Sequence, residues 1–256
     1  VGIWLNYGNV NGYDFWGNGA EGERQVKLGA VKHLAIESME GGDGEGTLLA
    51  KASWVDSSGK ELLAESSAYH FIAEGTTRII DRITTLKATG GQVDFPDTKE
   101  GFLGIRVARQ LELPSDEEVT LLDAQGVPTK IKALPNEGVT GNYRSSEGVT
   151  GAEVWGTRAR WMDLYGSIGD EKVSLVICDH PRNLNYPTYW HARGYGLFAA
   201  NPFGVKDFTK GKDSLNYALA AGQSVTFRYR FVISSGQQLT DEAINSYADA
   251  FDKLYH

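Results

Sequence analysis

Hydrophobic and polar residues alternate along much of the chain. Within residues 224–233, every second side chain from Val225 onward is apolar, and the positions between them include Arg228 and Arg230. A period of two is typical of an antiparallel strand that buries one face. The pattern predicts about eleven strands, at residues 3–7, 25–37, 47–55, 61–73, 76–86, 105–113, 153–162, 173–178, 189–199, 215–219 and 224–233.

Short connections rich in glycine separate these strands, as at residues 41–44 and 56–59. Many strands with hairpin-length connections and little helical periodicity indicate an all-β protein, a large antiparallel β-sandwich. Residues 115–126 could form one helical turn or an excursion. No linker or change of composition divides the chain, so we predict a single domain, 1–256.

The C-terminal segment follows a different period. Ile244, Tyr247, Phe251 and Leu254 recur at helical spacing, and Thr240 precedes two acidic residues as a candidate N-cap. These features predict that an amphipathic helix closes the chain.

Composition excludes several classes of function. The longest unbroken apolar run, counting Ala and Tyr, is the five residues 217–221, whereas a membrane-spanning helix needs about 20. The net charge of −8 and the absence of basic runs argue against nucleic-acid binding. The single cysteine, Cys178, excludes an internal disulfide and any multi-thiolate metal site. The compartment is left open, with a periplasmic or secreted location slightly favoured.

The densest group of polar and aromatic residues is 178–195, which begins where a buried strand ends. Its composition suits acid/base chemistry on a hydroxylated substrate. We predict that His180 is the general acid/base and Asp179 a carboxylate partner, and that substrate contacts come from Asn183, Trp190, His191 and Arg193. The alternative is a rigid turn in which Asp179 and Asn183 bond local backbone and Trp190 and Tyr195 lie in the core.

Three other segments contribute candidates. Glu100 could act as a base tuned by Lys99 and Arg106, or form an ordinary ion pair with Arg106. Arg158 and Arg160, framed by Trp155 and Trp161, could hold a carboxylate or line a sugar-binding cleft, or lie on a solvated strand face. Near the amino end, Tyr7 and Trp16 are candidates to line the site.

Serine-hydrolase, P-loop, zinc-protease and dinucleotide-binding motifs are absent from the sequence. No cofactor is predicted. A single divalent metal held by His180 and His191 is the alternative, on a spacing that is not diagnostic.

Several segments together resemble a known family. They are residues 4–16 (WLNYGNVNGYDFW), 97–101 (DTKEG), 155–161 (WGTRARW), the series Asp179-His180-Pro181-x-Asn183 through Trp190-His191-x-Arg193, and Asn201-Pro202-Phe203-Gly204. In this order they resemble a bacterial family labelled "methane oxygenase PmoA" or DUF6807. The label names a membrane enzyme, and no segment here could cross a bilayer, so we take it as a name and not as an activity.

The resemblance implies a large sandwich similar to that of aldose mutarotases and a role beside sugar-metabolising enzymes. The family pattern also has a His-Pro-His-His segment ahead of the equivalent of Gly2-Ile3-Trp4, so we expect a chain truncated at its N-terminus that lacks its first strand.

These observations predict a protein that acts on a small saccharide or glycan through acid/base chemistry in a concave cleft. Two alternatives are a non-catalytic glycan-binding or structural module and a metal-dependent oxidoreductase.

Overall fold

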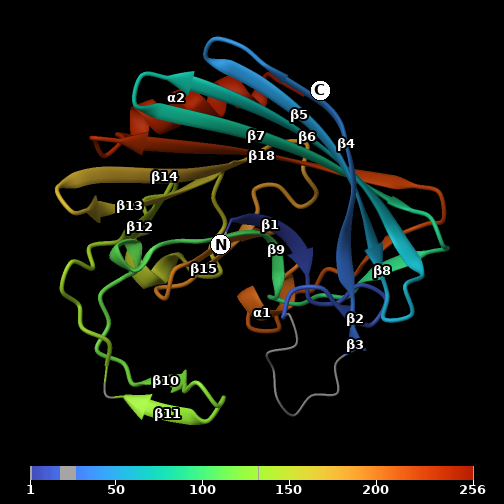
Figure 1. Ribbon diagram of the computed structural model, residues 1–256, viewed down its shortest axis with the longest axis horizontal. Coiled ribbons are helices and arrows are strands. Elements are labelled where there is room, and N and C mark those ends of the chain that lie inside the picture. The colour runs from blue at the N-terminus through green and yellow to red at the C-terminus, as the bar shows by residue number, and fades with distance from the viewer. Residues whose placement is uncertain (1, 18–26, 132, 256) are drawn as a thin grey trace.

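A computed structural model describes residues 2–17, 27–131 and 133–255. Its largest element is an antiparallel sheet of eight strands (Figure 1). In spatial order these are β12 (Asn142–Ser145), β13 (Trp161–Ile168), β14 (Glu171–Asp179), β18 (Ser224–Ser235), β7 (Thr77–Ala88), β6 (Glu61–Glu74), β5 (Glu45–Val55) and β4 (Ala30–Gly41).

A second antiparallel sheet of four strands packs against the first. Its order is β1 (Ile3–Tyr7), β9 (Gly101–Arg106), β16 (Leu197–Asn201) and β15 (Tyr189–Ala192). The main core lies between the two sheets and joins side chains such as Leu5, Leu103 and Phe198 of the small sheet to Phe227 and Phe231 of the large one.

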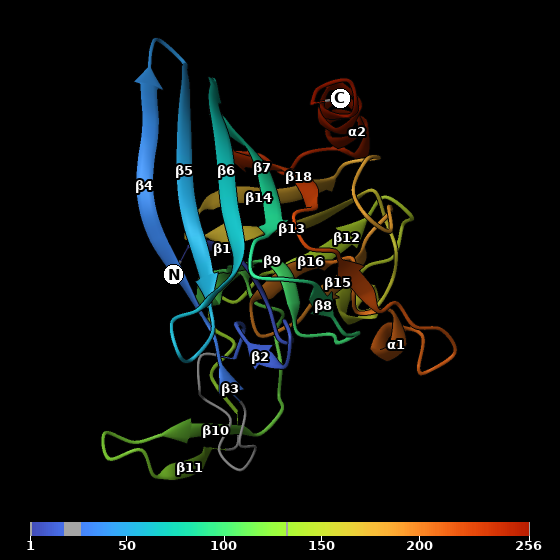
Figure 2. The same cartoon turned by 90° about the vertical axis from the view of Figure 1, so that its right-hand side faces the viewer.

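Short elements complete the fold. Three pairs of short strands are β2 (Tyr13–Asp14) with β3 (Lys27–Leu28), β8 (Val93–Phe95) with β17 (Tyr217–Leu219), and β10 (Val119–Leu122) with β11 (Pro128–Ile131). The helical elements are η1 (Arg109–Leu111), η2 (Gly151–Val154), α1 (Val205–Phe208) and α2 (Asp241–Asp252). Figure 2 shows the β10–β11 hairpin projecting from the body of the molecule.

The C-terminal helix α2 covers the other face of the large sheet (Figure 2). Its buried residues Ile244, Ala248 and Phe251 form a second core with residues that include Ile79 and Val232. Thr240 is its N-cap and accepts a hydrogen bond from the Ala243 amide, as the sequence predicts. The predicted all-β class and the C-terminal helix are therefore confirmed.

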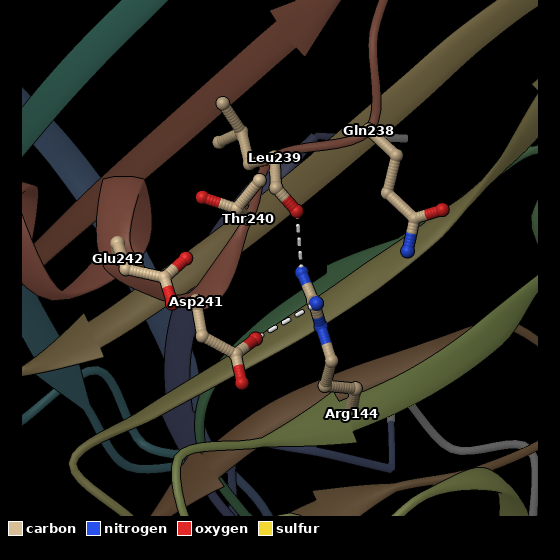
Figure 3. Close-up of a pocket in the computed structure, with 6 residues that line it drawn as sticks. All are labelled: Arg144, Gln238, Leu239, Thr240, Asp241 and Glu242. Carbon is tan, nitrogen blue, oxygen red and sulfur yellow. Dashed lines mark hydrogen bonds and ion pairs between the residues drawn. The ribbon is translucent and has the colours of Figure 1, made fainter.

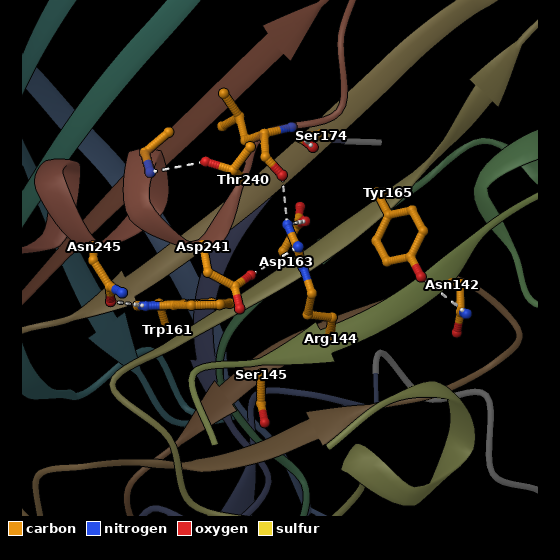
Figure 4. A network of polar contacts seen from close by, with 12 residues as sticks. Asn142, Arg144, Ser145, Trp161, Asp163, Tyr165, Ser174, Thr240, Asp241 and Asn245 are labelled. Carbon is orange, nitrogen blue, oxygen red and sulfur yellow. Dashed lines mark hydrogen bonds and ion pairs between the residues drawn. The ribbon is translucent and has the colours of Figure 1, made fainter. Parts of the chain in front are cut away.

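Polar contacts fasten the first half of α2. At its start, Arg144 donates to Asp163 (2.8 Å) and to the Leu239 carbonyl (2.6 Å) and pairs with Asp241 (2.8 Å), beside a shallow cavity of about 470 Å³ (Figure 3). The indole of Trp161 donates to Asn245 in the same network (Figure 4). This cavity therefore lies where α2 begins, and its lining residues hold the start of the helix on the sheet.

Two predicted strands are wrong in part. The strand predicted over 105–113 ends at Arg106, because the chain turns through η1, which returns Leu111 to the core. The strand predicted over 153–162 begins only at Trp161, because η2 and Gly156, with a φ of +73°, interrupt extended backbone. Over such short spans, turns that bury alternate residues imitate a strand pattern.

Three further segments refine the prediction. Residues 189–199 form two strands, β15 and β16, joined by a turn in which the Gly196 amide donates to the Arg193 carbonyl. Residues 115–126 belong to an excursion, the β10–β11 hairpin. The strand predicted over 25–37 corresponds to β3 and β4, although residues 25 and 26 lie outside the described residues. No helix in the described ranges is long and apolar enough to cross a bilayer.

Candidate functional site

One face of the small sheet points away from the main core, and we call it the outer face. Across the strands, His191 lies beside Ala199, Ala199 beside Gly104, and Gly104 beside Trp4. Adjacent strands are about 4.8 Å apart, so this row is about 14 Å wide. The two small residues in its middle, Ala199 and Gly104, are buried, as is His191, and Trp4 is the partly exposed member of the row.

A pair of tryptophans stands at one end of this row. The rings of Trp4 and Trp16 lie 5.7 Å apart, and both are partly exposed. Asp14 fixes the loop by accepting the Trp16 amide at 2.6 Å. A Cβ atom at Gly104 would lie 2.9 Å from the Trp4 ring and 3.1 Å from that of Trp16. The absence of a side chain at Gly104 therefore lets both rings rest on the sheet.

At the other end, His191 is held in one tautomer. Its Nδ1 lies 2.6 Å from the Lys99 carbonyl, which can only accept, so Nδ1 carries the proton. Burial, reinforced by the charge of Arg193, lowers the pKa of His191 to about 4. The ring is therefore neutral at physiological pH. Its Nε2 has no hydrogen bond to any described residue, and the residue as a whole is 2% exposed.

Arg193 lies on the ring of Trp155, with the guanidinium carbon 4.5 Å from the ring centroid. The same indole meets the rings of His191 and Phe208 edge-on. Within the described chain, neither Trp155 Nε1 nor Arg193 Nε has a hydrogen-bond acceptor, although both atoms are buried. Each such group costs about 1–3 kcal/mol. The pair is therefore the least satisfied polar feature of the outer face.

The loop before β9 forms a wall beside His191. Asn201 donates to the carbonyls of Thr98 (3.1 Å) and Lys99 (2.9 Å) and so holds this loop against the sheet. Glu100 pairs with Lys99 at 3.1 Å, and about a third of each side chain is exposed. Glu100 therefore pairs with Lys99 and not with Arg106.

Arg106 lies in the next row of the outer face, one strand from Leu197. It donates to the Tyr195 carbonyl at 2.9 Å and lies over the Tyr195 ring. Among the described residues, neither Arg106 nor Arg193 has a carboxylate within ion-pair distance. The outer face therefore combines aromatic rings with two cations that lack a counter-ion.

Arg158 lies at the border of the outer face, but its contacts there are structural. Its ring partner is Tyr189, at 5.1 Å, and Tyr189 in turn stacks on Phe208. The guanidinium donates to the carbonyls of Pro187 (2.8 Å) and Asn185 (2.9 Å). Arg158 thus holds the loop that leads into β15.

His180 lies elsewhere, under α2. Its Nδ1 accepts the Arg182 amide at 3.1 Å, so its Nε2 carries the proton and donates to the Leu254 carbonyl at 3.0 Å. Its ring also meets Phe251 edge-on. No hydrogen bond or ion pair within the described chain links His180 to Glu100, Arg158 or His191. Both ring nitrogens are therefore used in fastening the C-terminus.

Asp179 and Asn183 organise the loop that follows β14. Asp179 accepts hydrogen bonds from the Asn183 side chain and the Thr188 amide, both at 2.8 Å. Burial raises the pKa of Asp179 to about 7. The Asp179 contacts match the rigid turn that the sequence offered as an alternative, but Asn183 bonds the distant backbone of Arg228, and Tyr195 is exposed and not in the core. The catalytic roles of His180 and Asp179 stay predictions without geometric support.

Two further candidates lie in the core. Tyr7 is fully buried, and its hydroxyl donates to the Pro96 carbonyl. Trp190 is also fully buried, with its indole donating to the Ala159 carbonyl. Of the twelve predicted site residues, the structure gathers seven on or beside the outer face, namely Trp16, Glu100, Arg106, Trp155, Arg158, His191 and Arg193.

Sequence reasoning missed two kinds of residue. Asn201 and Phe208 support the outer face, and only the motif that contains Asn201 could have drawn attention to either. On the inner face of the large sheet, a buried ion pair joins Arg82 to Glu65 at 3.2 Å, and Glu65 also accepts the Trp54 indole. Glu65 occupies an inward position of its strand, and a charge at such a position was the available signal.

A metal centre finds no support in the donor set. Within the described ranges, no group of three or more His, Cys, Asp or Glu side chains is arranged to hold a metal ion. His180 uses both ring nitrogens in hydrogen bonds to the backbone of Arg182 and Leu254. His191 uses its Nδ1 in a hydrogen bond to the backbone of Lys99.

Solved structures with a similar chain path come from carbohydrate enzymes. The α-galactosidase AgaB of Geobacillus stearothermophilus matches with 11% identity and a TM-score of 0.38, over 92% of this chain and 32% of that one. A putative aldose 1-epimerase of Escherichia coli K12 matches with 10% identity and a TM-score of 0.33, over 82% and 69% of the two chains.

The chain spans about a third of the length of the α-galactosidases that it matches. These scores are too low to support an argument about function, which therefore rests on the site itself. No curated protein matches the sequence. A family model described as a family of unknown function (DUF6807) matches residues 1–249.

Proposed function

We propose, for a chain that belongs to the DUF6807 family of unknown function, that the outer face binds a saccharide carrying a carboxylate. The observation that carries this proposal is Arg193, a partly exposed cation on the Trp155 ring that lacks a counter-ion among the described residues. A planar carboxylate matches a guanidinium through paired hydrogen bonds.

The remaining groups of the outer face suit a sugar ring. Partly exposed rings of Trp4, Trp16 and Trp155 offer apolar faces against which a pyranose can pack. The lone pair of His191 Nε2 can accept a hydrogen bond from a sugar hydroxyl, because the low pKa keeps that nitrogen unprotonated. Arg106 supplies a second cation at the edge of the outer face.

Acid/base chemistry on the bound sugar would fall to Glu100 and His191. His191 cannot donate a proton from Nε2 at neutral pH, since its only proton is on Nδ1 and is held by the Lys99 carbonyl. Glu100 stands beside Lys99 on the adjoining wall. In this proposal Glu100 accepts the substrate proton, and His191 orients the hydroxyl.

The test is calorimetric titration with a uronic acid and with the corresponding neutral aldose. Arg193→Ala should weaken binding of the uronic acid by about tenfold to a hundredfold, as expected for the loss of a charge-assisted hydrogen bond. Arg182→Ala removes an exposed arginine outside the face and serves as the matched control. Equal affinity for the neutral and acidic sugars, or no effect of Arg193→Ala, would contradict the proposal.

Turnover separates an enzyme from a binding module. Epimerisation, elimination and hydrolysis products are sought by NMR with the sugars that bind. If Glu100→Gln abolishes turnover and leaves affinity within about threefold, Glu100 acts on the substrate proton. Binding without turnover of any sugar in the wild-type protein would favour the non-catalytic alternative.

A further inference from the structure

A groove of about 680 Å³ opens beside the outer face. Gly194 and Tyr195 of the β15–β16 turn form one side, and Leu113, Pro114 and Thr120, which lead into and start the β10–β11 hairpin, form another. Pockets of about 300–1,000 Å³ hold ligands of drug size, which are larger than one sugar ring. The groove therefore has room for more than a monosaccharide.

Arg193 belongs to both regions. It lines the groove, and its guanidinium lies on Trp155 of the outer face. Arg106 and Arg193 flank Leu197 on neighbouring strands, so their Cα atoms are about two strand spacings, or 10 Å, apart. A ligand whose carboxylate reaches Arg193 therefore has one end on the outer face, and the part of the ligand that follows the carboxylate lies at the mouth of the groove.

The walls of the groove suit uncharged sugar rings. Tyr195 is 54% exposed, unusually open for an aromatic side chain, and Arg106 lies over its ring at 5.3 Å. Leu113 and Pro114 add apolar surface, and Ser115 and Thr120 add hydroxyl groups. Aromatic surface bordered by a few polar groups is the usual composition of such sites.

Charge in the groove disfavours a second acidic sugar. Arg109, the other arginine of its lining, already forms an ion pair with Glu112, and Glu117 adds an exposed carboxylate. Like charges brought together in an interface weaken binding. Arg193 is thus the lining cation that has no carboxylate partner within the described chain.

We infer that the ligand is an oligosaccharide with a single acidic residue at one end, whose carboxylate is bound by Arg193 while neutral residues extend along the groove past Tyr195. This inference rests on the proposed function and specifies its substrate class.

Three probes test it by calorimetry: a uronic acid, a trisaccharide of one terminal uronic acid on two neutral pyranoses, and a trimer of the uronic acid. The mixed trisaccharide should bind at least about tenfold more tightly than the monosaccharide, and the all-acidic trimer more weakly than the mixed one. Tyr195→Ala should remove the gain of the mixed trisaccharide and leave the affinity for the monosaccharide unchanged. Phe71→Ala, at an exposed aromatic residue of the large sheet, is the control.

Three results would overturn the inference and leave the proposed function standing: equal affinity for the monosaccharide and the mixed trisaccharide, tightest binding of the all-acidic trimer, or a gain of the mixed trisaccharide that persists in Tyr195→Ala. If no probe binds, or if Arg193→Ala does not weaken the binding of those that do, the proposed function fails as well.

Discussion

His191 should make the folded state sensitive to acid. Burial lowers its pKa from 6.5 to about 4, so the native state disfavours the protonated ring. A histidine with a lowered folded pKa contributes stability above its unfolded pKa and loses that contribution as pH falls through the window between the two values. Here the window runs from about pH 6.5 down to about pH 4.

The size of the effect follows from the shift. At about pH 5 the unfolded histidine is almost fully protonated and the folded one is almost fully neutral, so linkage predicts a loss of about 2 kcal/mol relative to pH 8. Urea unfolding followed by tryptophan fluorescence at these two pH values measures it. His191→Gln should reduce the difference in unfolding free energy between the two pH values by about that amount.

His33 provides the matched control, because it is an exposed histidine on the edge strand β4. His33→Gln should leave the pH dependence of stability as it is in the wild-type protein. If His191→Gln also leaves it unchanged, the ring is not a buried neutral imidazole, and its role as a hydrogen-bond acceptor on the outer face falls with it.

Three further predictions concern the framework. Gly104→Val should displace the tryptophan pair, since even a Cβ atom there would lie 2.9 Å from the Trp4 ring; near-UV circular dichroism should lose intensity while the far-UV spectrum is retained. Asp81→Asn should lower the unfolding free energy by about 3–5 kcal/mol, because it leaves the buried Arg230 unpaired, and Asp81→Leu combined with Arg230→Met should recover most of that loss in urea titrations. Thr240→Ala should cost about 1 kcal/mol by removing the helix N-cap, and amide exchange should speed up first at the start of α2.

The candidate site was only partly predictable, for reasons that particular residues illustrate. His180 and His191 come from one polar cluster in the sequence, yet His180 fastens the chain at the end of α2 and His191 lies on the outer face. Composition assigned both histidines to one site, because it carries no information on the direction in which each side chain points. The turn held by Asp179, Asn183 and Thr188 separates them.

Contacts between distant segments were beyond the reach of the sequence. The hydrogen bond from His191 to the Lys99 carbonyl spans 92 residues, and the row that joins it to Trp4 runs through three strand pairings. Trp190 and His191 are adjacent in the sequence, and both were predicted to contact the substrate. The register of β15 on β16 puts the tryptophan in the core and the histidine on the outer face.

The sequence by itself determined the local structure of this protein: the alternation that makes a strand, the glycine-rich turns, and the helical spacing and N-cap at its end. Alternation and capping act within a few residues, so a single sequence carries them. Only the tertiary structure decided which polar side chains meet. Register and packing between segments far apart in the chain set those contacts. They left Trp155 and Arg193 together without acceptors in the described chain, and they supplied His180 Nε2 with the Leu254 carbonyl.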